Sequence, residues 1–273
     1  MGPNMNEAMS DAEFQLFQQL IHQTCGIHLT PNKKQLLVSR LHKRMDALRM
    51  KGFKEYREYV TEPSHGEEFS LMLNAVSTNK TDFFRESVHF DFLAQKVYPK
   101  IRNQSQIRIW CAASSSGEEP YTLAMTLAEA LGSTSRDVKI LATDISTKVL
   151  AEGEQGIYSE DTVSPVPQIY LKKYFLKGHN EWQGYYSVKD ELKQWVHFRR
   201  LNLMEPFPLS IEFDYVFVRN VMIYFDKETR ESLVNRMEKH LKVGGYLFIG
   251  NAESLSGLKH NYKYIQPAVY QRV

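Results

Sequence analysis

Short apolar runs alternate with helix-forming segments after residue 106, and this alternation most constrains the fold. The expected strands are 107–112, 138–142, 213–218 and 246–250, and the expected helices are 121–131, a segment from about Ser146, and 227–241. Consecutive parallel strands need a crossover, which is usually a helix. The pattern therefore predicts an α/β fold in which helices cover both faces of a mainly parallel sheet.

The part of the chain before this alternation has a helical pattern. Ser10 can cap a helix, and a second helix follows Pro31 with its own apolar stripe. The polar stretch 103–106 marks a boundary. We therefore expect an N-terminal helical domain with its linker over 10–100 and a second domain over 101–273.

Two segments depart from the alternation of strand and helix. Residues 184–188 and 195–198 are aromatic and β-branched and have turn residues around them, which predicts a small antiparallel β insertion over 178–200. The tail 262–272, broken at Pro267, predicts a closing hairpin.

Charge and cysteine usage exclude several classes of protein. The formal net charge of +2 is too small for a dedicated nucleic-acid binder. Cys25 and Cys111 are far apart, and the nine histidines are scattered, so neither a disulfide framework nor a metal site is predicted. No segment resembles a membrane span or secretory signal. These features predict a cytoplasmic protein without a metal ion.

The turn after the first expected strand predicts a ligand site. Small residues from Ala112 to Gly117 would let a ligand approach the backbone at the carboxyl edge of the sheet. Asp144, at the end of the second strand, can accept hydrogen bonds from both ribose hydroxyls of a nucleoside. A tight turn and a helix-capping aspartate are the structural alternatives.

The same turn separates two kinds of nucleoside ligand. A dinucleotide fingerprint needs three glycines, but only Gly117 is present. The acidic pair Glu118 and Glu119 would repel a pyrophosphate, whereas it suits an amino group and a sulfonium. The residues therefore favour S-adenosylmethionine over a nicotinamide cofactor.

Two further segments place polar groups beside apolar ones. Residues 78–86 (Thr-Asn-Lys-Thr-Asp-Phe-Phe-Arg-Glu) set an arginine next to an aromatic pair. Residues 214–225 run a buried strand into a polar tip that carries Arg219, Asn220 and Tyr224.

Together with the Gly-Glu-Glu-Pro-Tyr turn over 117–121 and the Arg-Asn-Val-Met-Ile-Tyr-Phe run over 219–225, segment 78–86 resembles the CheR family of chemotaxis receptor methyltransferases. The resemblance spans about residues 12–272. It implies a Rossmann-like class I methyltransferase sheet with an N-terminal helical domain, S-adenosylmethionine as cofactor and S-adenosylhomocysteine as product. The cofactor-binding residues it implies are Asn79, Thr81, Arg85, Glu119, Asp144, Asn202, Leu203, Arg219 and Asn220.

The reaction that the resemblance implies is the esterification of glutamate side chains on the cytoplasmic helices of bacterial chemoreceptors. A glutamate carboxylate with a pKa of about 4.3 is already ionised at neutral pH, so placement matters more than acid–base help. We assign Arg85 to orienting that carboxylate and Tyr224 to packing near the methyl group.

Three rival functions are open at this point. Missing glycines disfavour a nicotinamide oxidoreductase, and the absence of an Asn/Asp-Pro-Pro-aromatic motif disfavours a nucleic-acid methyltransferase. The third is an adaptor that binds receptor helices without catalysis, which the intact motifs disfavour.

Two surfaces are expected to hold the receptor. Lys33, Arg40, Arg44 and Lys51 follow at spacings of 7, 4 and 7, which on one helix would align them in a basic row facing an acidic receptor helix. A solvated face is the alternative. In some family members the β insertion docks a receptor's carboxyl-terminal pentapeptide, and an exposed strand edge suits that role. We expect a monomer that neither binds nucleic acid nor inserts into a membrane.

Overall fold

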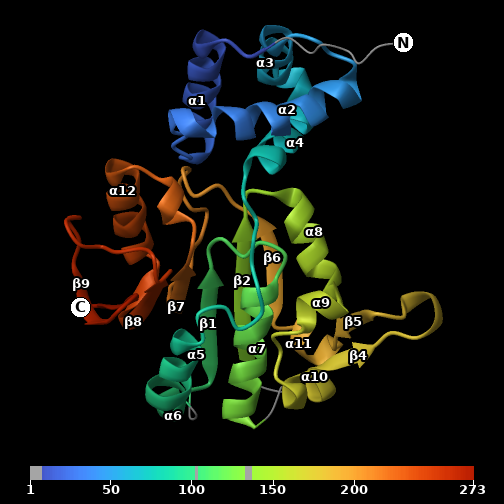
Figure 1. Cartoon of the computed structure of the whole chain (residues 1–273). Helices are drawn as coiled ribbons and strands as arrows, with labels where there is room; N and C mark the ends of the chain where they lie inside the picture. The colour runs from blue at the N-terminus through green and yellow to red at the C-terminus, as the bar shows by residue number, and fades with distance from the viewer. Residues whose placement is uncertain (1–7, 102–103, 133–136) are drawn as a thin grey trace.

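The computed structural model describes residues 8–101, 104–132 and 137–273. An N-terminal helical module lies above an α/β domain, and a small second sheet projects from one side of that domain (Figure 1). The expected boundary at 103–106 includes residue 103, which lies outside the described residues, and the domain limits stay a prediction.

Four helices with two short 3₁₀ turns make the helical module: α1 (Asp11–Cys25), η1 (Pro31–Lys33), α2 (Lys34–Leu48), α3 (Phe53–Thr61), η2 (Pro63–His65) and α4 (Gly66–Val76). Ser10 caps α1 as expected, and the Glu13 carboxylate accepts a hydrogen bond from the Ser10 backbone N–H. The apolar stripes of α1 and α2 meet in one core that includes Phe17, Ile21 and Leu41.

A seven-stranded sheet in the order β6-β2-β1-β7-β8-β10-β9 forms the centre of the α/β domain. The strands are β1 (Gln106–Cys111), β2 (Asp137–Asp144), β6 (Val196–Arg200), β7 (Phe213–Val218), β8 (Leu241–Ile249), β9 (Tyr262–Gln266) and β10 (Val269–Arg272). Strands β6, β2, β1, β7 and β8 run parallel, and β8, β10 and β9 pair antiparallel in turn, which confirms the tail hairpin.

The chain order reverses between β1 and β7, because β2 lies on one side of β1 and β7 on the other. In open α/β sheets this switch point opens a crevice at the carboxyl ends of the strands. The topology therefore brings the ends of β1, β2 and β7 together at one edge.

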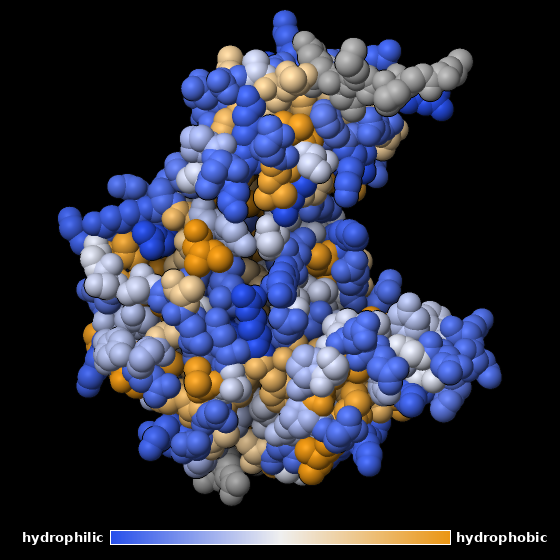
Figure 2. All heavy atoms as spheres, in the orientation of Figure 1, coloured by the Kyte–Doolittle hydropathy of each residue, from blue (hydrophilic) through white to orange (hydrophobic). Residues whose placement is uncertain are grey.

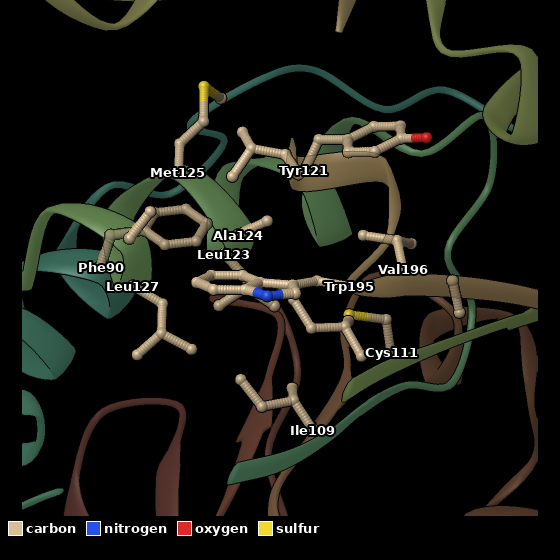
Figure 3. Close-up of a cluster of buried hydrophobic side chains, with 14 of the residues drawn as sticks. Phe90, Ile109, Cys111, Tyr121, Leu123, Ala124, Met125, Leu127, Trp195 and Val196 are labelled. Atoms are coloured by element: carbon tan, nitrogen blue, oxygen red, sulfur yellow. The ribbon is translucent and has the colours of Figure 1, made fainter. Parts of the chain in front are cut away.

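Helices cover the sheet on both faces: α5 (Val88–Phe92), which continues through a π turn η3 (Leu93–Val97) into α6 (Tyr98–Ile101), α7 (Glu118–Leu131), α8 (Thr147–Gln155) and α12 (Lys227–Glu238). Figure 3 shows α7 side chains gathered with Ile109 and Cys111 of β1 and with Trp195. Because α7 begins directly at the first loop, its packing fixes where that loop lies. Helix α12 ends three residues before the expected limit at residue 241.

The second sheet is antiparallel, as expected, but its extent was predicted wrongly. It consists of β3 (Ile157–Ser159), β5 (Tyr185–Val188) and β4 (Phe175–Lys177) in that order, with α9 (Glu160–Val163), α10 (Gln168–Tyr174) and the turn η4 (Asn180–Trp182) between its strands. Segment 195–198 instead enters β6, which pairs parallel with β2. Helix α11 (Asp190–Lys193) turns the chain away from the small sheet after β5. Segment 195–198 is as aromatic and β-branched as β5 although it leads into an edge strand of the main sheet, so composition could not separate the two sheets.

Candidate functional site

The loop after β1 is closely packed against its neighbours. Ser115 and Gly117 have φ angles of +47° and +98°, and a Cβ on Gly117 would lie 2.8 Å from the Tyr158 hydroxyl. Glycine is therefore needed at the start of α7. Ser115 donates its hydroxyl to the Asn79 carbonyl at 2.7 Å, which joins the loop to segment 78–86.

Asp144 lies at the end of β2 and faces this loop. Its Oδ2 accepts the Ser115 N–H and its Oδ1 accepts the Ser146 N–H, both at 3.0 Å. Burial raises the pKa of Asp144 against the effect of these hydrogen bonds. Each carboxylate oxygen can accept further hydrogen bonds, so Asp144 is oriented by the backbone and can still bind a pair of hydroxyls.

Arg219, at the end of β7, is buried between two carboxylates. Its Nη1 donates to Glu119 Oε2 at 2.7 Å, and its Nη2 donates to Glu86 Oε2 at 3.2 Å. Burial raises the pKa of Glu119. Burial also acts to raise the pKa of Glu86, but hydrogen bonding from Asn220 and the charge of Arg219 outweigh it and lower that pKa.

This arrangement corrects the expected role of the acidic pair. Glu119 pairs with Arg219, which it shares with Glu86, and Glu118 accepts the Ser116 hydroxyl at 2.9 Å. The two acids therefore do not present a joint negative charge to a ligand. The case against a pyrophosphate then depends on the missing glycines rather than on charge repulsion.

Two adjoining hollows lie at this edge of the sheet and share Ala113 and Asp144. The first hollow, lined by charged and polar groups, contains seven of the nine expected cofactor residues: Asn79, Thr81, Arg85, Glu119, Asp144, Arg219 and Asn220. The second, mostly apolar hollow contains the other two, Asn202 and Leu203, with Ile145, Leu201 and Phe225.

The two hollows suit the two ends of S-adenosylmethionine. An adenine ring needs flat apolar walls, the ribose needs an acceptor between the two ends, and the amino acid end needs groups of both charges. The apolar hollow, Asp144 and the first hollow supply these in that order. Arg219 also lines the first hollow, and its Nε–H is a buried donor that has no hydrogen-bond partner among the described residues.

Asn202 lines the apolar hollow, but its amide hydrogens bind other residues of the protein rather than face a ligand. Its Nδ2 donates to the Thr24 carbonyl of α1 at 2.6 Å and to Glu205 Oε1 at 3.0 Å. These bonds tie the apolar hollow to the helical module.

The two residues expected to act on the substrate lie in neighbouring hollows. Arg85 lines the first hollow and donates to the Lys80 carbonyl at 2.9 Å. Tyr224, on the turn η5 (Met222–Tyr224), lines a third hollow with Lys33 and Arg40 of the helical module. The first and third hollows meet at Thr78.

The predicted basic row on one helix is wrong. Helix α2 ends at Leu48, and Arg49 turns the chain with φ +59°, so Lys51 lies beyond the helix, while Lys33 lies in the 3₁₀ turn before it. Arg44 pairs with the buried Glu68, and Arg40 donates to the Val76 and Ser77 carbonyls at the end of α4. Helical spacing gives the direction of a side chain but not the groups that neighbouring helices bring to it.

Two acidic residues that hold residues of the site were missed. Glu86 accepts hydrogen bonds from Arg219 and Asn220, and Glu253 accepts backbone N–H groups around the end of β7. The signal for Glu253 was an acid shortly after a strand, the same signal that identified Asp144.

No helix within 8–101, 104–132 and 137–273 is both long and apolar enough to cross a membrane. Over those same ranges, His, Cys, Asp and Glu side chains do not gather in threes as a metal site would require.

Family comparisons match nearly the whole chain. The CheR methyltransferase SAM binding domain matches residues 79–270, and the CheR methyltransferase all-alpha domain matches residues 12–77. A chemotaxis protein methyltransferase of Borreliella burgdorferi is 44% identical over 282 residues, which cover 98% of this chain and 97% of that protein. Chemotaxis protein methyltransferase 2 of Pseudomonas aeruginosa is 41% identical, covering 94% and 92% of the two chains. The chemotaxis protein methyltransferase of Escherichia coli K12 is 37% identical, covering 96% and 91%.

Proposed function

The chain belongs to the CheR methyltransferase family, and from this we propose that it methylates glutamate side chains on the cytoplasmic helices of chemoreceptors. It is an S-adenosylmethionine-dependent methyltransferase. The product on the receptor is a glutamate methyl ester, and S-adenosylhomocysteine is released.

The observation that carries the proposal is the junction of two hollows at Thr78. The first hollow, called the cofactor hollow from here on, has the charged wall and ribose acceptor that suit the cofactor. The third hollow, called the acceptor hollow, has a basic wall formed by Lys33 and Arg40. Complementary charge would draw an acidic receptor side chain into this basic hollow, which meets the cofactor hollow at Thr78.

The residues of the chain position the reactants rather than move protons. When bound, S-adenosylmethionine supplies an electrophilic methyl group on its sulfonium. The glutamate carboxylate is ionised at neutral pH, since its ordinary pKa is about 4.3, so no general base is required. Asp144 binds the ribose, and Arg85 orients the acceptor carboxylate. Tyr224 closes the acceptor side and helps to exclude water, which favours a reaction that consumes two opposite charges.

Lys33, Arg40, Arg44 and Lys51 were expected to bind the receptor together. Lys33 and Lys51 are exposed, and Lys33 and Arg40 line the acceptor hollow. We assign the receptor contact mainly to Lys33 and Lys51, because the hydrogen bonds of Arg40 and Arg44 use these side chains within the helical module.

The small sheet supplies the second proposed receptor contact. Its exposed apolar side chains include Leu176, Trp182 and Tyr185, and the sheet projects away from the rest of the domain (Figure 1). A receptor's carboxyl-terminal pentapeptide could add as a strand beside β4, which pairs with β5 on its other side. The enzyme would act as a monomer in the cytoplasm, where the receptor helices lie.

Space-filling atoms show an indentation between the helical module and the small sheet (Figure 2). A receptor helix bundle held at both places would span this indentation. The methylated glutamate and the tethering peptide would then belong to different parts of one receptor array.

The test is transfer of a radiolabelled methyl group to a receptor cytoplasmic fragment, followed by mild base. A glutamate ester releases the label as methanol, whereas an N-methyl group resists base. An adaptor would bind the fragment without labelling it, and base-stable label would contradict the glutamate assignment. Titration with NADH serves as the control for the oxidoreductase alternative and should show no binding.

A further inference from the structure

The carboxylate of Glu253 lies behind the loop that ends β7. Its Oε2 accepts the N–H groups of Gly250 at 2.6 Å and Asn220 at 3.0 Å, and its Oε1 accepts the Ile223 N–H at 3.1 Å. Glu253 belongs to the segment after β8, so one side chain joins the ends of two adjacent strands.

The loop held in this way contributes to both sides of the site. Arg219, Asn220 and Val221 line the cofactor hollow, while Ile223 and Tyr224 line the acceptor hollow. Each oxygen of Glu253 holds one side of this loop. Oε2 accepts the Asn220 N–H on the cofactor side, and Oε1 accepts the Ile223 N–H on the acceptor side.

Asn220 needs such support because its backbone is left-handed. Its φ is +58°, a conformation that costs a non-glycine residue on the order of 1 kcal/mol or more. Glu253 holds its backbone N–H, and Glu86 accepts its Nδ2 at 3.1 Å. Carboxylates from two other segments therefore hold Asn220, one at its backbone and one at its side chain.

Gly250 allows the close approach that this arrangement requires. A Cβ at Gly250 would lie 2.5 Å from Asn220 Nδ2 and 2.9 Å from Glu253 Oε2. Only glycine leaves room for the end of β8, the loop and the carboxylate together.

We propose that Glu253 is a positioning residue which holds the 219–224 loop in the shape that binds the cofactor on one side and the receptor glutamate on the other. It lines neither hollow and acts through Asn220 and Ile223. The inference rests on the proposed function for the identity of both ligands. A carboxylate suits the task because it only accepts, whereas an amide would turn its NH₂ toward at least one N–H.

The experiment compares Glu253→Gln with Asp214→Asn. Asp214 is a buried carboxylate at the opposite end of β7, where it accepts the Arg108 N–H at 2.8 Å and the Lys242 ammonium at 2.7 Å. Thermal melting, the Kd of S-adenosylhomocysteine by calorimetry, and KM for a receptor fragment are measured for both variants.

Glu253→Gln should raise the Kd roughly tenfold and should also raise KM, because the negative charge that strengthens the hydrogen bonds on both sides of the loop is lost and the NH₂ group faces at least one N–H. Asp214→Asn should lower the melting temperature and leave Kd and KM within about twofold, because its bonds lie at the far edge of the sheet. Glu253→Asp keeps the charge with a shorter reach, so its Kd should fall between those of the wild type and Glu253→Gln. This variant also gives the comparison if Glu253→Gln does not fold.

A Glu253→Gln protein that melts lower but binds S-adenosylhomocysteine and receptor normally would overturn the positioning role. Failure of the wild type to bind S-adenosylhomocysteine would instead contradict the proposed function, so the two failures are distinguishable.

Discussion

The carboxyl edge of the sheet and helix α2 both carry charged residues, but they use them differently. At the edge, Arg219, Glu119 and Asp144 come from three separate strands and helices and converge on one hollow. On α2, Arg44 turns back to Glu68, and this pair stabilises the module itself. The sheet topology brings the residues of the carboxyl edge together. Helical spacing alone does not bring the basic residues of α2 together as a binding surface.

Replacing the central arginine of each region should give the largest difference in stability and in cofactor affinity between the two regions. Arg219→Met leaves Glu86 and Glu119 near each other without their counter-charge, which should lower the free energy of unfolding by about 3–5 kcal/mol. Cofactor affinity should fall as well. Chemical denaturation and calorimetry with S-adenosylhomocysteine measure the two effects.

Arg44→Met is the matched variant in the helical module. Its loss should destabilise the protein less, because the Arg44 side chain reaches solvent and Glu68 keeps the hydrogen bond from the Tyr56 hydroxyl at 2.8 Å. Cofactor affinity should not change. If Arg44→Met weakened the cofactor as much as Arg219→Met does, the two regions would not be separable.

The same contrast explains how much the sequence could predict. Asp144 and Arg219 follow buried strands, and parallel strands end at one edge, so their convergence was predictable. The extent of the small sheet was not, because segment 195–198 resembles β5 in composition and only the strand pairing shows that it enters the main sheet. Arg44 could not be assigned either, because Glu68 lies on another helix and nothing in a single helix's periodicity indicates it. The pairing of Glu119 with Arg219 likewise depends on tertiary contact.

The next largest effect on stability should come from a buried histidine near the carboxyl edge, through the pH dependence of unfolding. Burial and the charge of Arg219 lower the pKa of His89 to about 4 from an ordinary value of 6.5. His89 is fully buried and both its ring nitrogens are without hydrogen-bond partners among the described residues. Its folded pKa is depressed, so the native state holds the neutral ring while the unfolded state takes up a proton.

The stability that this histidine contributes is therefore present above pH 6.5 and is lost as the pH falls from 6.5 toward 4, by up to roughly 3 kcal/mol. His89→Leu should flatten this part of the stability profile. His65→Gln, which removes a partly exposed histidine that stacks on Tyr59 in the helical module, is the matched control variant. The free energy of unfolding is measured with urea at pH 6.5, 5.5 and 4.5. If it fell with pH equally in the wild type and in His89→Leu, the assignment would be refuted.

The smallest effect should come from the exposed lysines beside α2. Lys33→Glu/Lys51→Glu should raise KM for receptor a few-fold and weaken its salt dependence, because surface charges affect encounter more than affinity. Lys96→Glu/Lys263→Glu makes the same change in net charge on other exposed positions and should have little effect. Equal KM values for the two double variants at low and high salt would mean that the lysines near α2 only solubilise the protein.

The central claim is that the carboxyl edge of the sheet binds S-adenosylmethionine through Asp144. Calorimetric titration with S-adenosylhomocysteine, comparing the wild type with Asp144→Asn, tests it most directly, since the asparagine keeps the size of the side chain but loses its charge. The account predicts tight binding by the wild type and a Kd raised roughly 10- to 150-fold in a variant that still folds, which corresponds to about 1.5–3 kcal/mol for hydrogen bonds to a charged group. An unchanged Kd in the folded variant would contradict it.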